Sequence, residues 1–166
     1  MNIIGKAHKF GDFINTDIHC SNKYMPTGTP QAEVIKRIFV DIKPGFSESV
    51  GESDVIAAGI GFGTVSSRDD APLILLKIGI KAVLAKSFGY LFYRNSINVG
   101  LPLVECDTDM INQNDMIAVD LLKAEVTNLT LKRGIESRTK YSPEILRILQ
   151  DGGLINHLSK HGGYAI

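Results

Sequence analysis

The stretch DVIAAGIGFGTVSSRDDAPLILLKIGIKAVLAKSFGYLFYRNSINVGLPLVEC, residues 54–106, decides the fold. Three short apolar runs in it are typical of buried strands; they span residues 54–59, 82–87 and 101–106. The two segments between them have the apolar spacing of helices, and each ends at a glycine, Gly79 or Gly100, as helices commonly do. Strands that alternate with helices over short connections predict right-handed crossovers and a parallel sheet.

The flanking sequence adds further elements to this centre. Residues 2–8 predict a first strand, and residues 30–39 a short amphipathic helix that begins at a proline. Three alternating stretches predict short antiparallel strands; they span residues 115–119, 122–127 and 129–133. Ser142 is placed to cap a last long helix that stops at two glycines, with an amphipathic turn after it. We expect one mixed α/β domain over residues 1–166, with a mostly parallel central sheet, flanking helices and additional short antiparallel strands.

Composition narrows the class of protein. Eighteen basic and eighteen acidic residues cancel, so there is no charge footprint for nucleic acid or an anionic membrane. No apolar run has the length of a membrane helix, and the first residues lack the apolar region of a signal peptide, so we expect a cytoplasmic protein. The two cysteines lie far apart, which favours reduced thiols, and the four histidines are scattered, which favours surface or structural roles over metal binding.

The segment GIGFGTVSSRDDAP, residues 59–72, carries the strongest functional signal. A P-loop needs a lysine after its last glycine, and a nucleophile elbow needs G-x-S-x-G; the segment has neither. A dinucleotide fingerprint is matched only weakly, because Ser66 stands where a late glycine belongs. Two interpretations remain: a helix cap from Ser66, Ser67 or Asp69, and an anion site in which hydroxyls, backbone N–H groups and Arg68 hold a carboxylate.

Two long matches identify a family. They are AAGIGFGTVSSRDDAP…LLKIGIKAVLAKSFGYLFYRNSINVGLPL, within residues 57–103, and GDFINTDIHCSNKYM, residues 11–25. In order and spacing the sequence resembles the small subunits of 3-isopropylmalate dehydratase, which are the swivelling domain of the aconitase superfamily. Ser-Ser-Arg alone is a weak motif, but its combination with KSF, FYRN, N-x-GLP and an upstream Asn-Thr-Asp is specific.

The resemblance implies a role for each matching residue. Ser66 would be the base that, as an alkoxide, takes a proton from the substrate carbon, and Ser67 and Arg68 would hold a substrate carboxylate. Asp17 would support an acid–base histidine on the partner, and Thr16 would help to position that segment. The family's substrate-sensing loop corresponds to Tyr24, Met25, Pro26 and Thr27. This loop has no arginine for a third carboxylate, and its methionine suits a branched alkyl group.

The sequence also departs from the family pattern. Where the family has FGCGSSREHAP, this chain has FGTVSSRDDAP, so Thr64 and Val65 replace Cys-Gly, and Asp69 and Asp70 replace Glu-His. Valine stiffens a position where glycine gives freedom. Because the two serines and Arg68 remain, we interpret the site as altered rather than inactive.

The resemblance implies a heteromeric hydro-lyase of leucine biosynthesis that interconverts 3- and 2-isopropylmalate. We expect no cofactor on this chain, because it lacks the three cysteines that hold the family's four-iron–four-sulfur cluster. The expected partners are a cluster-bearing large subunit and a small dicarboxylate; the isolated chain could also form a homo-oligomer. The alternatives are a subunit for another malate derivative, such as 2,3-dimethylmalate or homoaconitate, and a non-catalytic anion-binding module.

Overall fold

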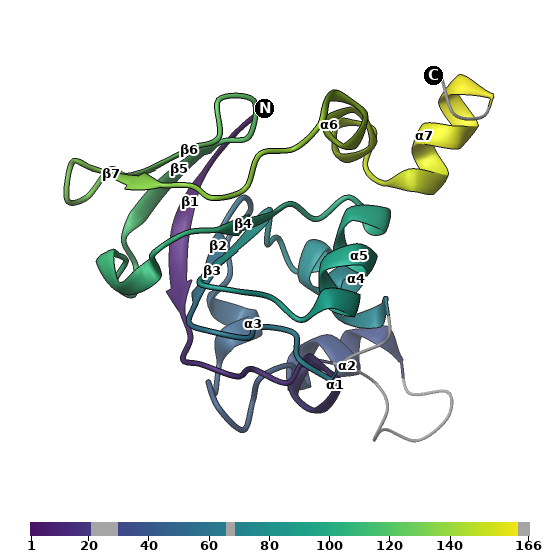
Figure 1. The fold of residues 1–166 in the computed structure, drawn as a ribbon. Helices are drawn as coiled ribbons and strands as arrows, with labels where there is room; N and C mark the ends of the chain where they lie inside the picture. The colour runs from purple at the N-terminus through teal and green to yellow at the C-terminus, as the bar shows by residue number, and fades with distance from the viewer. Residues whose placement is uncertain (21–29, 66–68, 163–166) are drawn as a thin grey trace.

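One seven-stranded sheet with the strand order β4-β3-β2-β1-β5-β6-β7 forms the centre of the molecule (Figure 1). The computed structural model describes residues 1–20, 30–65 and 69–162. The strands are β1 (Asn2–Lys9), β2 (Val55–Ala58), β3 (Ala82–Ala85), β4 (Leu103–Glu105), β5 (Met116–Asp120), β6 (Glu125–Asn128) and β7 (Arg133–Glu136). The helices are α1 (Thr16–His19), α2 (Gln31–Arg37), α3 (Phe46–Ser49), α4 (Asp70–Lys77), α5 (Tyr90–Val99), α6 (Pro143–Gln150) and α7 (Leu154–His161), with a 3₁₀ turn at Thr108–Met110.

Strand β1 joins a parallel half of the sheet to an antiparallel half. On one side it pairs in parallel with β2, with Ala7 opposite Val55, and β3 and β4 continue the parallel half. On its other side it pairs antiparallel with β5, with Ile4 opposite Ala118, and β6 and β7 follow. The predicted mixed fold, with a parallel centre and additional antiparallel strands, is confirmed.

The last antiparallel strand lies later than the sequence predicts. The pattern at 129–133 is wrong for a strand, because residues 129–132 form the turn between β6 and β7. The Asn128 side chain accepts a hydrogen bond from the Leu131 backbone N–H at 3.0 Å, and Lys132 has a φ of 52°. Exposed leucines that alternate with polar residues in this turn imitate the period of a strand.

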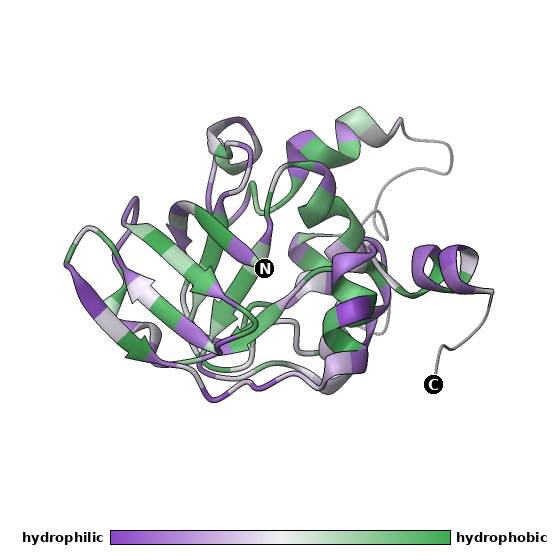
Figure 2. Ribbon diagram, turned by 90° about the horizontal axis from the view of Figure 1, so that it is seen from above, coloured by the Kyte–Doolittle hydropathy of each residue, from purple (hydrophilic) through white to green (hydrophobic). Residues whose placement is uncertain are grey.

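Both faces of the parallel half are buried, in agreement with its uniformly apolar strands. Helices cover one face, where the large core side chains are phenylalanines: Phe39, Phe46, Phe62 and Phe92. Residues from β5, β6 and β7 cover the other face, because the antiparallel half curls over it. Figure 2 shows hydrophobic residues concentrated in the centre of the molecule, whereas the strands of the antiparallel half alternate between hydrophobic and hydrophilic residues.

The curl brings the two edges of the sheet together. Cys106 and Ser137 form an isolated antiparallel bridge, and the Arg138 N–H donates to the Glu105 carbonyl oxygen at 2.8 Å. The Tyr141 hydroxyl accepts from the Leu103 N–H at 2.9 Å and donates to its carbonyl oxygen at 2.5 Å. The segment after β7 therefore runs along β4. In the described part of the chain, no helix is long and apolar enough to cross a membrane.

Candidate functional site

The predicted motifs follow strands whose carboxyl ends meet at one edge of the parallel half. Ligands bind at this edge in many α/β sheets. Residues 10–15 follow β1, and residues 59–65 follow β2. Three backbone hydrogen bonds hold these loops together. Gly59 N–H donates to the Gly11 carbonyl at 3.0 Å, Phe13 N–H to the Ile60 carbonyl at 2.7 Å, and Gly63 N–H to the Ile14 carbonyl at 2.9 Å. The front motif and the glycine loop, far apart in sequence, are therefore neighbours.

Helix α1 is built from the Asn-Thr-Asp motif. Asn15 is its N-cap, and its side-chain oxygen accepts from the N–H groups of Asp17 at 3.0 Å and Ile18 at 3.3 Å. Thr16 and Asp17 are buried in the first turn. The Thr16 hydroxyl has no hydrogen-bond partner among the described residues. The cap therefore fixes Asp17 next to the glycine loop.

The end of α1 also reaches the start of α4. Cys20, which follows α1, is fully buried, and its sulfur lies 3.7 Å from the carbonyl oxygen of Ala71 in the first turn of α4. Ser66, Ser67 and Arg68 come directly before this turn in the sequence and lie outside the described residues. Tyr24, Met25, Pro26 and Thr27 also lie outside them. Of the predicted site residues, the structure thus describes Thr16 and Asp17.

The glycine loop needs glycine at Gly63. This residue has a φ of 77°, and a Cβ there would lie 2.3 Å from Cγ of Phe92 in α5. A side chain would require the buried phenylalanine to move. The third glycine of the motif thus lets the loop lie against α5, which is a packing role rather than phosphate binding.

Val65 stands at the end of the described part of this loop, with its side chain 82% exposed. Its φ of 72° is a left-handed conformation that β-branched residues rarely adopt. The sequence predicts loss of freedom where the family has glycine, and the backbone indeed requires a conformation that favours glycine. Val65 therefore introduces strain directly before Ser66.

The predicted cap of α4 is only partly correct. Asp69 occupies the N-cap position, but its side chain makes no capping hydrogen bond to the first turn. Its φ of −87° and ψ of −7° are helical, whereas a capping side chain usually needs an extended backbone. Within the described residues, α4 therefore begins without a side-chain cap.

A charged pocket beside the glycine loop was not predicted. It has a volume of about 530 Å³ and is lined by Ile60, Lys86, Ser87, Asp107, Asp109 and Arg138. Lys86 forms an ion pair with Asp109 at 2.6 Å, and this hydrogen bond raises the pKa of the lysine and lowers that of the acid. Arg138 donates to the Lys86 carbonyl oxygen at 2.7 Å. Sequence reasoning missed Arg138 because only the curl of the sheet brings it here.

Neither cysteine is suited to ligating a metal cluster. Cys20 and Cys106 are both buried free thiols. Burial raises the pKa of both, to about 12 for Cys106, so both thiols stay protonated at neutral pH. Iron–sulfur clusters need several thiolates. The cysteines of this chain therefore do not fit such a cluster.

Comparisons with known proteins agree with this arrangement. A family model described as the aconitase C-terminal domain matches residues 10–108. The chain is 45% identical to 3-isopropylmalate dehydratase small subunit 2 of Archaeoglobus fulgidus, over 100% of both chains. It is 42% identical to the small subunit of Caldicellulosiruptor saccharolyticus, over 91% of this chain and 87% of that one. A crystal structure of a 3-isopropylmalate dehydratase from Methanocaldococcus jannaschii matches with a TM-score of 0.87 and 41% identity, over 98% of this chain and 96% of that one.

Proposed function

This chain belongs to the 3-isopropylmalate dehydratase small subunits, a hydro-lyase family of the aconitase type, and on that premise we propose that it forms half of an isopropylmalate site. Its partner would be a large subunit, and the substrate would be bound between the two. The reaction would move a hydroxyl group between neighbouring carbons by dehydration and rehydration.

One observation carries the proposal: two segments with separate roles in the family lie together in this fold. Helix α1 carries Asp17. Ile14, two residues before the helix, accepts a hydrogen bond from Gly63, and Cys20, which follows it, contacts the first turn of α4. The Ser-Ser-Arg motif lies between Gly63 and that turn in the sequence. Contacts on both sides of the motif thus support a shared site with Asp17.

The proposed chemistry assigns one task to each residue. Ser66 takes the proton from the substrate carbon, and the electrons of the broken C–H bond form the double bond as the C–O bond breaks. The hydroxyl group leaves as water after it receives a proton from an acid on the partner, which Asp17 would support. Ser67 and Arg68 hold a carboxylate, for which a planar guanidinium supplies two parallel hydrogen bonds. A serine is a weak base, so nearby cations and exclusion of water must stabilise its alkoxide.

The family's four-iron–four-sulfur cluster would belong to the large subunit. The buried, protonated cysteines of this chain do not fit it, and no step assigned here to this chain depends on it. This division explains why the family works as two subunits: the base and the anion site come from this chain, and the cluster from the other.

The substrate preference would come from the loop that includes Tyr24, Met25, Pro26 and Thr27. These residues offer no arginine and one flexible apolar side chain, which favours a branched alkyl group over a third carboxylate. The second candidate function is a subunit for 2,3-dimethylmalate or homoaconitate. The exposed, strained Val65 beside the serine motif favours this candidate, because it departs from the family where the substrate would bind.

The test is to combine the chain with its large subunit under anaerobic conditions and compare Ser66→Ala with Ser67→Ala. We expect Ser66→Ala to lower kcat by about 10²–10⁴-fold, the usual contribution of a positioned base. Ser67→Ala should mainly raise KM, since its hydroxyl binds a carboxylate that is present throughout the reaction. Equal and mild effects of both changes would refute the assigned base. Turnover of dimethylmalate or homoaconitate in preference to isopropylmalate would favour the second candidate.

A further inference from the structure

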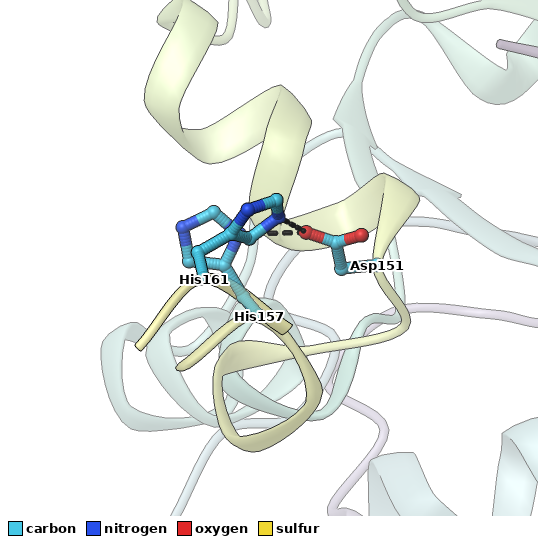
Figure 3. A group of neighbouring side chains, drawn as sticks. All are labelled: Asp151, His157 and His161. Atoms are coloured by element: carbon cyan, nitrogen blue, oxygen red, sulfur yellow. Dashed lines mark hydrogen bonds and ion pairs between the residues drawn. The ribbon is translucent and has the colours of Figure 1, made fainter. Parts of the chain in front are cut away.

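Three metal-binding side chains meet at the junction of α6 and α7, a group not expected from four scattered histidines. Figure 3 shows His157 and His161, one turn apart on α7, both directed toward Asp151. His157 Nδ1 lies 2.7 Å and His161 Nε2 lies 3.0 Å from the same carboxylate oxygen, Oδ2 of Asp151. All three ligand atoms lie within 4.8 Å of one another.

The turn between the helices fixes this arrangement. Asp151 ends α6, and Gly152 and Gly153 follow with φ values of 80° and 107°. A Cβ on Gly153 would lie 2.6 Å from the carbonyl oxygen of Asn98, so only glycine allows this turn to pack on the end of α5. The chain reversal thus places the carboxylate beside the histidine face of α7.

Burial makes the group rigid on one side and accessible on the other. His157 is 4% exposed, which restricts its ring, whereas the side chain of His161 is 44% exposed. An ion could therefore enter past His161 without opening the core. Two histidines at positions i and i+4 of a helix already face the same point, so little ordering is needed on binding.

Lys160 contacts the other oxygen of the carboxylate. Its Nζ lies 2.8 Å from Oδ1 of Asp151, which leaves Oδ2 to the two histidines. A hydrogen bond to the second oxygen of a ligating carboxylate is a common way to orient it toward a metal.

We propose that Asp151, His157 and His161 bind one divalent transition-metal ion of the Zn²⁺ type. The ligands are His157 Nδ1, His161 Nε2 and Oδ2 of Asp151, with water at the fourth position. Two imidazoles and one carboxylate suit Zn²⁺ and Co²⁺, whereas Mg²⁺ and Ca²⁺ prefer all-oxygen sites. Helix α7 lies far from α1 and the candidate functional site (Figure 1), so the ion would fasten α7 to the end of α6 rather than take part in dehydration.

The experiment uses the full chain, stripped of metal by a chelator and titrated with Co²⁺ or Zn²⁺ at neutral pH. We expect one ion per chain, the visible absorption of four-coordinate Co²⁺, and a higher thermal unfolding temperature that Mg²⁺ does not produce. Asp151→Asn and His161→Gln should each weaken binding by at least about tenfold.

Two matched controls separate this site from others. His19→Gln alters a histidine that pairs with Asp41, outside the group, and should leave binding unchanged. Lys160→Gln removes the positive charge but keeps a hydrogen-bond donor that can orient Oδ1 of Asp151, so metal binding should persist. The proposal is overturned if no Co²⁺ spectrum develops, if Asp151→Asn and His161→Gln bind as tightly as the original chain, or if His19→Gln alone abolishes binding.

Discussion

Gly63 and Val65 share a left-handed backbone two residues apart, but only Gly63 has the residue type that this backbone favours. At Gly63 the reason for glycine is physical, since the Phe92 ring occupies the space of a side chain. At Val65 the side chain is 82% exposed, so burial contributes little to offset the strain of its backbone. Because Val65 costs stability directly before the proposed base, we expect its strained backbone to influence the position of Ser66.

Val65→Gly should therefore stabilise the chain. A left-handed conformation costs a residue with a Cβ about 1–2 kcal/mol, and part of this gain is offset by the greater freedom of glycine in the unfolded chain. We expect a net increase of about 0.5–1 kcal/mol in the free energy of unfolding, measured by urea denaturation.

Val40→Gly is the matched control for this substitution. Val40 is also exposed, and it is not among the residues with positive φ. Its replacement should destabilise the chain, because only the cost of glycine remains. Equal effects of the two substitutions would contradict strain at Val65.

At the scale of single elements, α1 is too short to be stable alone. A helix of one turn gains little from its own hydrogen bonds, so its position depends on the Asn15 cap and on the link between Ile14 and Gly63. The cap thus determines where Asp17 lies relative to the glycine loop.

Asn15→Ala removes both capping hydrogen bonds and should cost about 1 kcal/mol of stability. In the two-subunit enzyme we expect a loss of activity larger than this modest destabilisation would cause, because Asp17 is displaced. Asn15→Asp keeps an acceptor at the N-cap and should restore both stability and activity. If the alanine and aspartate variants have the same activity, the cap does not position the site.

The sequence predicts elements well where the signal is local. The strands and helices of residues 54–106 follow from apolar runs and stopping glycines, and Ser142 does cap α6, accepting from the Ile145 N–H. Prediction fails where distant contacts decide. Arg138 reaches Lys86 only through the curl of the sheet, and His157 and His161 meet Asp151 only because two glycines reverse the chain.

At the scale of the whole molecule, a buried hydrogen bond between His8 and Asp54 links β1 to the start of β2. His8 is 1% exposed, and its Nε2 lies 2.8 Å from Oδ2 of Asp54. The same Oδ2 accepts from the Gly51 backbone N–H, and Oδ1 accepts from that of Lys6. Burial lowers the pKa of His8. The pKa of Asp54 is also lowered: desolvation raises it, but the hydrogen bonds from Gly51, His8 and Lys6 together outweigh that effect.

These two shifts predict a stability that falls in two steps on acidification. At pH values above 6.5, the ordinary pKa of histidine, the His8 contribution to stability should be constant. At pH values below 6.5, His8 binds a proton more readily in the unfolded state than in the folded state, so stability falls. At pH values below 3.8, the ordinary pKa of aspartate, protonation of Asp54 in the unfolded state lowers the stability again.

Urea denaturation across this pH range measures both steps. His8→Gln, which keeps a donor for Asp54 but does not titrate, should abolish the upper step and retain the lower one. An unchanged upper step in the variant would show that another group causes it.

The position of β1 between the two halves of the sheet has a consequence for biosynthesis. A ribosome makes β1 long before β5, yet Asn2 pairs with Asp120, and β1 cannot complete its hydrogen bonds until that strand emerges. Until then, the nascent chain exposes an unpaired strand edge, of the kind that recruits chaperones or misassembles. Because β1 and β5 are far apart in the sequence, their pairing raises the contact order of the fold, and high contact order slows folding. We expect the risk of aggregation to be greatest before β5 has been synthesised.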